Sequence, residues 1–230
     1  MDFEPATTLT EQIADHIGGE IILGRLRSGA RIQELKVAGE LKVSRGSVRE
    51  ALLILESRHL IEIVPRRGAV VSSMESDEVA CFCDVFTELQ SLCFSKLAER
   101  DNPDLTVLDD ALLMMQAAVL DADLAGLLEA RKCFLLGALP PLKNFYLSSV
   151  LKGLVPVGQR VDHLVSAHPA FDPRDCLRYH QALFEAISNS QLDRVQELVR
   201  AYHGREKKLA AGCTDPVMRG RPNHGDAGLA

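Results

Sequence analysis

Residues 43–52 (VSRGSVREAL) constrain the fold more than any other part of the chain, because they predict a short helix with one buried face and one basic face. Ser44 is a preferred N-cap residue, whose hydroxyl accepts a hydrogen bond from the first turn. Apolar residues follow at helical spacing and predict one buried face: Val48, Ala51, Leu52 and Leu55. Arg45 and Arg49 are four residues apart and therefore project together from the exposed face. With Ser47 between them they suit the major groove of DNA, and a surface helix with two solvated arginines is the alternative.

The residues before this helix predict two further helices. Residues 8–11 (TLTE) have the pattern of a capping box, which opens a helix that ends near Gly24. A second helix is expected over residues 33–41. Only two residues separate it from Ser44, which is the short connection of a helix-turn-helix.

The residues after the recognition helix predict a β-hairpin. Alternating apolar residues indicate strands over 61–64 and 69–71, and the turn between them carries Arg66, Arg67 and Gly68. Because a two-stranded hairpin is not stable alone, we expect it to pack on the helices. Two arginines and a glycine at its tip allow close approach to a phosphate. The whole order is that of a winged helix.

Six groups of residues within 9–71 carry a family resemblance: Gly29, 43–45 (VSR), 48–52 (VREAL), 55–56 (LE), 60–62 (LIE) and 67–70 (RGAV). They are similar to the DNA-binding domain of the GntR family of bacterial transcription regulators. The resemblance implies that Arg45, Ser47 and Arg49 contact a double-stranded DNA operator, and that Gly68 lies over the minor groove. The full expected DNA-binding set is Arg31, Lys36, Ser44, Arg45, Ser47, Arg49, Arg66, Arg67 and Gly68.

The chain departs from this family at three places. It has Arg27-Ser28-Gly29 before the second helix and Gly46-Ser47 after the first arginine of the recognition helix. Leu35 stands where an arginine is usual, with Lys36 beside it as a substitute. We expect these changes to affect which operator is read rather than whether DNA is bound.

The charge pattern favours a sequence-selective DNA binder over an indiscriminate one. The whole chain has a formal net charge of −6. Residues 42–67 nevertheless hold six basic and three acidic side chains. A local positive charge on an acidic protein fits a binder in which base contacts supplement the attraction to phosphates.

Three features of the sequence predict a cytoplasmic protein. No run of about 18 apolar residues indicates a membrane span. No charged-then-apolar signal segment opens the chain. The six cysteines include no Cys-x-x-Cys pair, so we expect reduced thiols rather than a zinc site.

The remainder of the chain is expected to be helical, after a short linker around residues 72–76. Helices are expected at 77–100, 105–120, 123–139, 142–167, 173–188 and 191–211. The predicted fold is therefore mostly α, with an N-terminal winged helix-turn-helix plus a C-terminal all-helical bundle. We place the DNA-binding domain at 1–74, the helical domain at 77–211 and a disordered tail at 212–230.

Two motifs in the helical half resemble the FCD domain, the ligand-sensing domain of the FadR branch of the same family. Phe134, Asn144 and Leu147 match its central motif, and residues 179–183 (YHQAL) match a second one. The resemblance implies effector binding and dimerisation by this domain. In many members it also implies a divalent metal, held by one Asp and three His, that anchors a carboxylate effector.

This chain lacks most of those metal ligands. Arg131 and Leu135 stand at the positions of the Asp and the first His, and only His180 falls on a His position. Tyr202 replaces the last His, with His203 one residue beyond. Because a metal needs about three protein ligands, we expect none, and His180 and His203 are the only candidates. A hydrogen-bonded histidine inside the bundle is the favoured interpretation of His180.

Two interpretations of Arg131 stay open. In the first, its guanidinium faces the cavity and receives the carboxylate or phosphate of a small-molecule effector, such as an organic acid. Arg160, His180 and Tyr202 are then its candidate neighbours. In the second, Arg131 points to solvent, and an apolar bundle senses a hydrophobic ligand or nothing. Phe86, where the family has an arginine, favours the second.

The expected function is that of a ligand-responsive regulator that represses a metabolic operon and binds a palindromic operator as a homodimer. One alternative is a DNA-binding or interaction protein whose effector site has degenerated. Another is an enzyme on the helical half, with these histidines as acid–base groups: His163, His168, His180 and His203. None of them lies in a nucleophile elbow, a phosphate loop or a metal motif, so we expect no enzyme.

Overall fold

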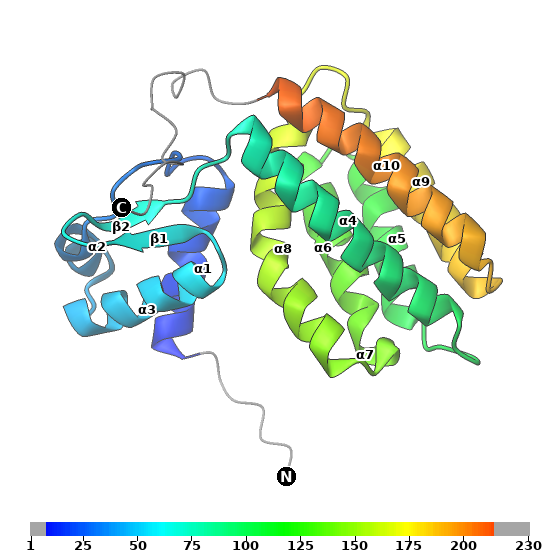
Figure 1. Cartoon of the computed structure of the whole chain (residues 1–230), viewed down its shortest axis with the longest axis horizontal. Coiled ribbons are helices and arrows are strands. Elements are labelled where there is room, and N and C mark those ends of the chain that lie inside the picture. Colours follow the sequence, from blue (N-terminus) through cyan, green and yellow to red (C-terminus); the bar gives the residue numbers. More distant parts are fainter. Residues whose placement is uncertain (1–7, 214–230) are drawn as a thin grey trace, which may run out of the picture.

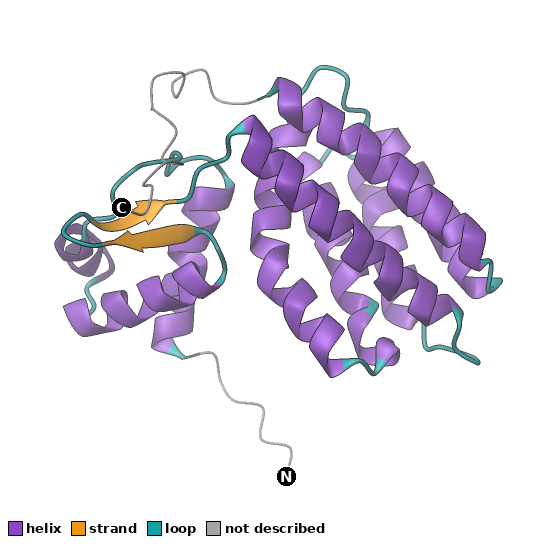
Figure 2. Ribbon diagram, viewed as in Figure 1, coloured by secondary structure: helices purple, strands orange, loops and turns teal. Residues whose placement is uncertain are grey.

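The structure, a computed structural model, describes residues 8–213. Its N-terminal part consists of α1 (Leu9–Ile22), α2 (Glu34–Leu41), α3 (Arg45–Ser57), β1 (Ile61–Val64) and β2 (Gly68–Val71). The helices that follow are α4 (Ser76–Ala98), α5 (Thr106–Leu120), α6 (Leu124–Gly137), α7 (Leu139–Leu142), α8 (Phe145–Ser166), α9 (Pro173–Ser188) and α10 (Leu192–Gly212). Figures 1 and 2 show the hairpin in the N-terminal part, beside the helical bundle. The predicted fold class is confirmed.

Local hydrogen bonds determine where α1 and α3 begin. The Glu11 N–H donates to Thr8 Oγ1 at 3.2 Å, and the Thr8 N–H donates to the Glu11 carboxylate at 2.8 Å, which confirms the capping box. Ser44 Oγ accepts from the Ser47 N–H at 3.0 Å, so Ser44 is the N-cap of α3. Lys42 ends α2 in the left-handed conformation (φ 55°), which makes the turn into α3 short.

The hairpin packs on the helices through one shared core. The two strands are antiparallel, with Ile61 opposite Val71. β2 begins at Gly68, whose positive φ of 79° suits the turn. Arg31 forms an isolated antiparallel bridge with Val70, an edge contact that the alternation pattern does not predict. The core side chains come from α1, α3, the strands and the connection before β1: Ile13, Ile17, Ile21, Val48, Leu52, Leu55, Leu60, Ile61 and Val71.

The helical part buries a second, larger core. In Figure 1, α4 and α10 lie side by side along one face of the bundle, and α5 packs against α6. Its largest fully buried side chains include Phe94, Leu97, Leu108, Met115, Leu127, Phe134 and Leu183. Each such side chain contributes about 1.5–3 kcal/mol through its removal from water.

Two predicted boundaries of the helical part change. The helix expected over 142–167 begins at Phe145 instead, because Pro140 and Pro141 lie in the separate short helix α7. Asn144 then caps α8, and its Oδ1 accepts from the Leu147 N–H at 3.1 Å. At the other end, α10 extends through Gly212, so the expected start of the tail at residue 212 is wrong; the rest of the expected tail, residues 214–230, lies outside the described part. Within residues 8–213, no helix is long and apolar enough to cross a membrane.

We expect Gly137→Ala to lower the free energy of unfolding by about 1–3 kcal/mol. A Cβ at this last residue of α6 would lie 2.6 Å from Val107 Cγ1 and 3.3 Å from Leu108 Cδ1 of α5. Gly153→Ala in α8 is the matched control, because a Cβ there meets nothing within 4 Å and the change should stabilise by about 1 kcal/mol. Urea unfolding followed by circular dichroism measures both, and equal effects at the two sites would contradict the α5–α6 packing.

Candidate DNA-binding face and helical-domain cavity

The recognition-helix pattern gives a helix with one buried and one exposed face. Val48, Ala51, Leu52 and Leu55 of α3 are buried, as predicted. The side chains of Arg45 and Arg49 are 64% and 75% exposed. In Figure 1 the N-terminal end of α3, α2 and the tip of the hairpin all lie at the side of the molecule away from the bundle. One solvent-facing surface therefore carries most of the predicted DNA-binding residues.

Glu34, the first residue of α2, lies between the two arginines. Its carboxylate is 3.9 Å from Arg45 Nη2 and 3.7 Å from Arg49 Nε. Exposed ion pairs of this length contribute little free energy, so both guanidinium groups are oriented but not locked. Glu34 is not in the predicted DNA-binding set, although an acidic residue in the first turn of α2 was visible in the sequence.

The serines of this surface have different surroundings. Ser44 Oγ already accepts from the backbone of α3, and it lies 2.9 Å from Ser47 Oγ. Ser47 is half-buried at the first turn of the helix, where a phosphate also meets the positive end of the helix dipole. Ser44 therefore acts mainly as a cap, while the Ser47 hydroxyl has Ser44 Oγ as its hydrogen-bond partner.

The wing places further basic side chains beside its glycine. Arg66 and Arg67 are exposed at the hairpin tip, and Arg66 takes a left-handed conformation (φ 63°). A Cβ at Gly68 would lie 3.8 Å from Arg31 Nε, so the Arg31 guanidinium is near the tip. Lys36 is exposed on α2 and pairs loosely with Glu40 at 3.8 Å.

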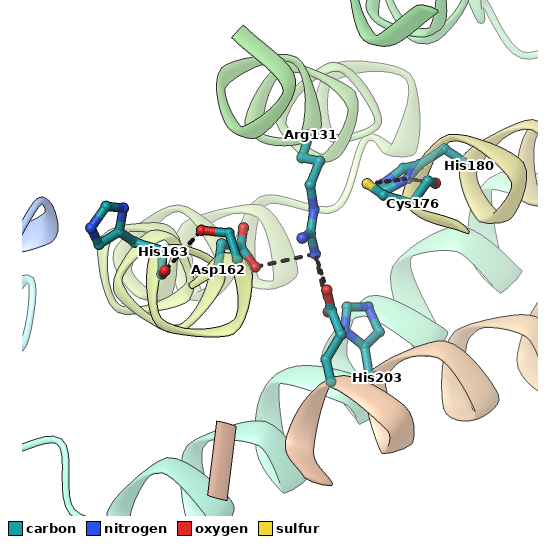
Figure 3. Close-up of polar contacts among 8 residues, drawn as sticks. Arg131, Asp162, His163, Cys176, His180 and His203 are labelled. Carbon is teal, nitrogen blue, oxygen red and sulfur yellow. Dashed lines mark hydrogen bonds and ion pairs between the residues drawn. The ribbon is translucent and has the colours of Figure 1, made fainter. Parts of the chain in front are cut away.

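In the helical half, Arg131 lies inside the bundle and is 6% exposed. Its Nη2 is 3.1 Å from Asp162 Oδ1 and 2.9 Å from Glu206 Oε1. Figure 3 shows Arg131 of α6 and Asp162 of α8 pointing toward each other, and Glu206 belongs to α10. The interpretation in which Arg131 points to solvent is therefore wrong. The interpretation in which it faces the cavity is right about its position, but its guanidinium already holds two carboxylates.

Burial and charge act in opposite directions on this cluster. Burial opposes the charge of Arg131, but the two carboxylates outweigh it and raise the pKa of the guanidinium. Burial raises the pKa of Asp162. Although burial also acts on Glu206, Arg131 and a hydrogen bond from His203 lower the pKa of that carboxyl. The His203 Nδ1 lies 3.2 Å from Glu206 Oε2.

His180 is a neutral, hydrogen-bonded histidine beside this cluster. Its Nδ1 is 2.8 Å from the carbonyl oxygen of Cys176, so this nitrogen carries the proton. Burial, together with the charge of Arg131, lowers the pKa of His180 to about 3. Tyr202 lies nearby, stacked on Tyr179 with ring centroids 3.9 Å apart and with Arg131 Cζ 5.6 Å from its own centroid.

We expect His180→Asn to flatten the pH dependence of stability below pH 6.5. The folded-state pKa of His180 is depressed, so the unfolded chain binds more protons between pH 6.5 and about 3. Stability contributed by the neutral ring is therefore full above pH 6.5 and is lost as the pH falls. Urea unfolding at pH 7.5 and pH 5 should show a smaller acid loss in the variant, because Asn does not titrate. An equal loss in both proteins would contradict the buried neutral ring.

A cavity of about 50 Å³ opens beside these groups. Its polar lining includes Arg131, Asp162, His180, His203, Glu206, Tyr179, Gln90, Gln159 and Thr87. Its apolar lining includes Phe82, Phe86, Phe94, Phe134, Leu135 and Val155. Tyr202 does not line it, and lies behind Tyr179 in the aromatic stack.

The residues at this site do not fit the divalent metal implied by the resemblance. A guanidinium lies between the two carboxylates, and a second cation there would be repelled. The proton on His180 Nδ1 is held by a backbone carbonyl. No group of three or more His, Cys, Asp or Glu in the described part of the chain is arranged to hold a metal.

Arg160 does not lie beside Arg131, and that prediction is wrong. Positions 160 and 162 point about 200° apart on a helix, so Arg160 leaves α8 on the other side from Asp162. It is 7% exposed and donates to the carbonyl oxygen of Ser72 at 3.2 Å and to Ser28 Oγ at 3.2 Å. Burial lowers the pKa of Arg160 to about 10. Arg160 thus joins the bundle to the winged helix.

His163 and His168, the other two histidines of the enzyme alternative, make contacts away from His180. His168 Nδ1 accepts from the Ala170 N–H at 3.0 Å, which is a local loop contact. Figure 3 shows His163 on the side of α8 that faces away from Arg131.

Comparison with known proteins identifies both halves of this fold. The family described as "Bacterial regulatory proteins, gntR family" matches residues 9–71, and the FCD domain matches residues 83–204. A gluconate operon transcriptional repressor of Bacillus licheniformis is 35% identical over 109 residues, which cover 47% of this chain and 44% of that protein. The HTH-type transcriptional regulator McbR of Escherichia coli (strain K12) is 24% identical over 182 residues, which cover 78% of this chain and 82% of McbR.

The solved structures agree in fold. The structure of E. coli McbR/YncC has a TM-score of 0.75 at 20% identity, with 90% of this chain and 99% of that chain covered. A putative transcriptional regulator GntR from Rhodococcus sp. RHA1 has a TM-score of 0.73 at 20% identity, with the same coverage.

A winged helix joined to an FCD-type bundle defines a class of transcription regulators rather than of enzymes. This chain belongs to the GntR family of bacterial regulatory proteins and carries an FCD domain.

Proposed function

We propose that this protein is a ligand-responsive transcription regulator that binds a palindromic operator as a homodimer and represses a metabolic operon. The observation that carries the proposal is the exposed N-terminal end of α3, where Arg45 and Arg49 project beside the wing. Residues 1–74 are the proposed DNA-binding domain and residues 77–211 the proposed effector and dimerisation domain. Because its partner is DNA, we place the protein in the cytoplasm.

In the proposed complex, α3 enters the major groove. Arg45 and Arg49 pair with base edges, and Ser47 binds a phosphate or a base. Gly68 and the flanking arginines of the wing approach the minor groove, while Arg31 and Lys36 bind phosphates. The DNA competes with Glu34 for the two α3 arginines, so binding replaces two weak ion pairs with contacts to the DNA.

In a homodimer two small DNA-binding domains contact the operator together, which increases the specificity of binding. A two-fold axis places two recognition helices about one helical turn of DNA apart, which makes the operator palindromic. A repressor function is supported by the similarity to the gluconate operon repressor, which covers less than half of that protein's length.

An effector in the cavity has a short route to the DNA-binding head through α8. Val161 and Asp162 line the cavity, while the preceding residue, Arg160, binds Ser72 and Ser28 at the contact between the two domains. A ligand that favours one position of α8 therefore changes the orientation of the winged helix and, in a dimer, the distance between the two heads.

The test is to incubate the purified protein with sheared genomic DNA of its source and to sequence the retained fragments. The proposal predicts enrichment of a short palindrome next to a metabolic operon. If the folded protein at low salt retains DNA fragments that share no common sequence, sequence-specific regulation is contradicted. In that event an interaction protein with a degenerate effector site becomes the better account of the chain.

A further inference from the structure

The chemical class of the effector follows from the charges around the cavity, provided that the cavity is the effector site proposed above. Arg131 is the buried cation there, and it is within 3.1 Å of both Asp162 and Glu206. Two carboxylates thus face the single positive charge of its guanidinium, and His203 donates a hydrogen bond to Glu206. The site already contains the anions that Arg131 requires.

An anionic ligand is therefore at a disadvantage in this cavity. To reach Nη2 of Arg131 a carboxylate would have to displace Asp162 or Glu206, leaving a buried carboxylate without its partner. If it stayed beside them, it would meet two like charges in surroundings of low dielectric constant.

Several buried hydrogen-bonding groups nevertheless have no partner within the described residues. Arg131 Nη1, Tyr179 Oη and His203 Nε2 are buried and unpaired. On His180 the proton is at Nδ1, so Nε2 offers a lone pair, and no bond to it is seen within the described residues. All four residues line the same cavity. Arg131 Nη1 can only donate and His180 Nε2 can only accept, so a matching ligand must do both.

Much of the remaining cavity lining is apolar. Phe82 and Phe86 stack with ring centroids 4.9 Å apart, and Phe134 and Val155 add to the apolar lining. A Cβ on Gly158 would lie 3.0 Å from the Phe86 ring, so the missing side chain makes room for the ring. The volume of about 50 Å³ suits a ligand of few heavy atoms, with a polar head and a short apolar body.

We propose that the cavity binds a small uncharged ligand of the carboxamide class. Its carbonyl and N–H groups would bond to the unpaired atoms Nη1 of Arg131, Oη of Tyr179 and Nε2 of His180. The ion cluster of Arg131, Asp162 and Glu206 stays intact and excludes the corresponding carboxylate.

Isosteric pairs of probes test the class directly: acetamide and acetate, isobutyramide and isobutyrate, benzamide and benzoate. Each pair shares shape and differs in charge. With the full-length protein, at least one amide should raise the melting temperature with concentration, and its carboxylate should have no effect up to tenfold higher concentration. Saturation-transfer NMR gives an independent measure of binding.

Two variants connect the response to the cavity. Thr87→Trp places a large ring at the partly exposed rim and should abolish amide binding without burying a new group in the core. Glu206→Gln removes one of the competing anions and should improve carboxylate affinity at least tenfold while changing amide affinity less. If Glu206→Gln unfolds, Asp162→Asn tests the same point at a carboxylate that is 23% exposed.

The outcomes separate this proposal from the function on which it rests. A carboxylate that binds the wild-type protein more tightly than its amide would overturn the ligand class and leave the cavity as an effector site. No response to any of the three amides would also overturn it, while retention of a palindrome by the same protein would leave the regulator function standing.

Discussion

Arg131→Met should lower the free energy of unfolding by about 3–5 kcal/mol, because it leaves the buried carboxylate of Glu206 and the partly buried carboxylate of Asp162 without their cation. Methionine fills a similar volume and cannot replace the charge. The destabilisation should shrink between pH 7 and pH 5. Without Arg131 both carboxyl groups have raised pKa values in the folded state, so they gain protons there before they do in the unfolded chain.

The control for this prediction is the triple variant Arg131→Met, Asp162→Asn and Glu206→Gln. It removes all three charges together and should recover most of the loss, because no buried ion remains unpaired. Urea unfolding followed by circular dichroism at both pH values gives the comparison. If Arg131→Met alone lowers the free energy of unfolding by less than about 1 kcal/mol, which is the effect expected for an exposed ion pair, the buried cluster is contradicted.

Arg49→Ala should weaken specific DNA binding by about 1–3 kcal/mol and relax the preference at one base pair of each half-site. The side chain is 75% exposed, and its one ion pair within residues 8–213 is the 3.7 Å contact with Glu34, so the fold should lose little. Anisotropy titrations with the retained palindrome and its single-base variants measure both effects.

Arg194→Ala is the matched control for Arg49→Ala. It removes the same charge from an exposed arginine of α10, which pairs with Glu197 in the helical half. Its operator affinity should stay within a few tenths of a kcal/mol of wild type. Equal losses in the two variants would show that net charge, rather than a base contact by α3, controls binding.

Local patterns made the N-terminal part predictable from the sequence. The capping box at Thr8 and Glu11, the Ser44 cap and the buried face of α3 depend on residues within one or two turns of each other. Such contacts follow from helical spacing alone. The break before α8 was also visible in Pro140 and Pro141, although the exact start required the Asn144 cap.

Contacts between distant elements were not predictable in the same way. Arg131, Asp162 and Glu206 come from three helices, and their spacing along the chain carries no periodic signal. One clue was available, since Glu206 shares the buried face of α10 with Val195, Val199 and Ala210. A glutamate on such a face requires a partner. The contact of Arg160 with Ser72 and Ser28 was not predicted, because a family resemblance gives sequence positions but not the face of α8 from which a side chain projects.

The measurement that tests the account most directly is the ratio of affinities for the retained palindrome and for a scrambled duplex of equal composition. At one fixed salt concentration near physiological, a regulator that reads bases through α3 should give a ratio of at least about 10³. A ratio near one would mean that the protein binds only the phosphate backbone, and it would contradict sequence-specific regulation by this chain.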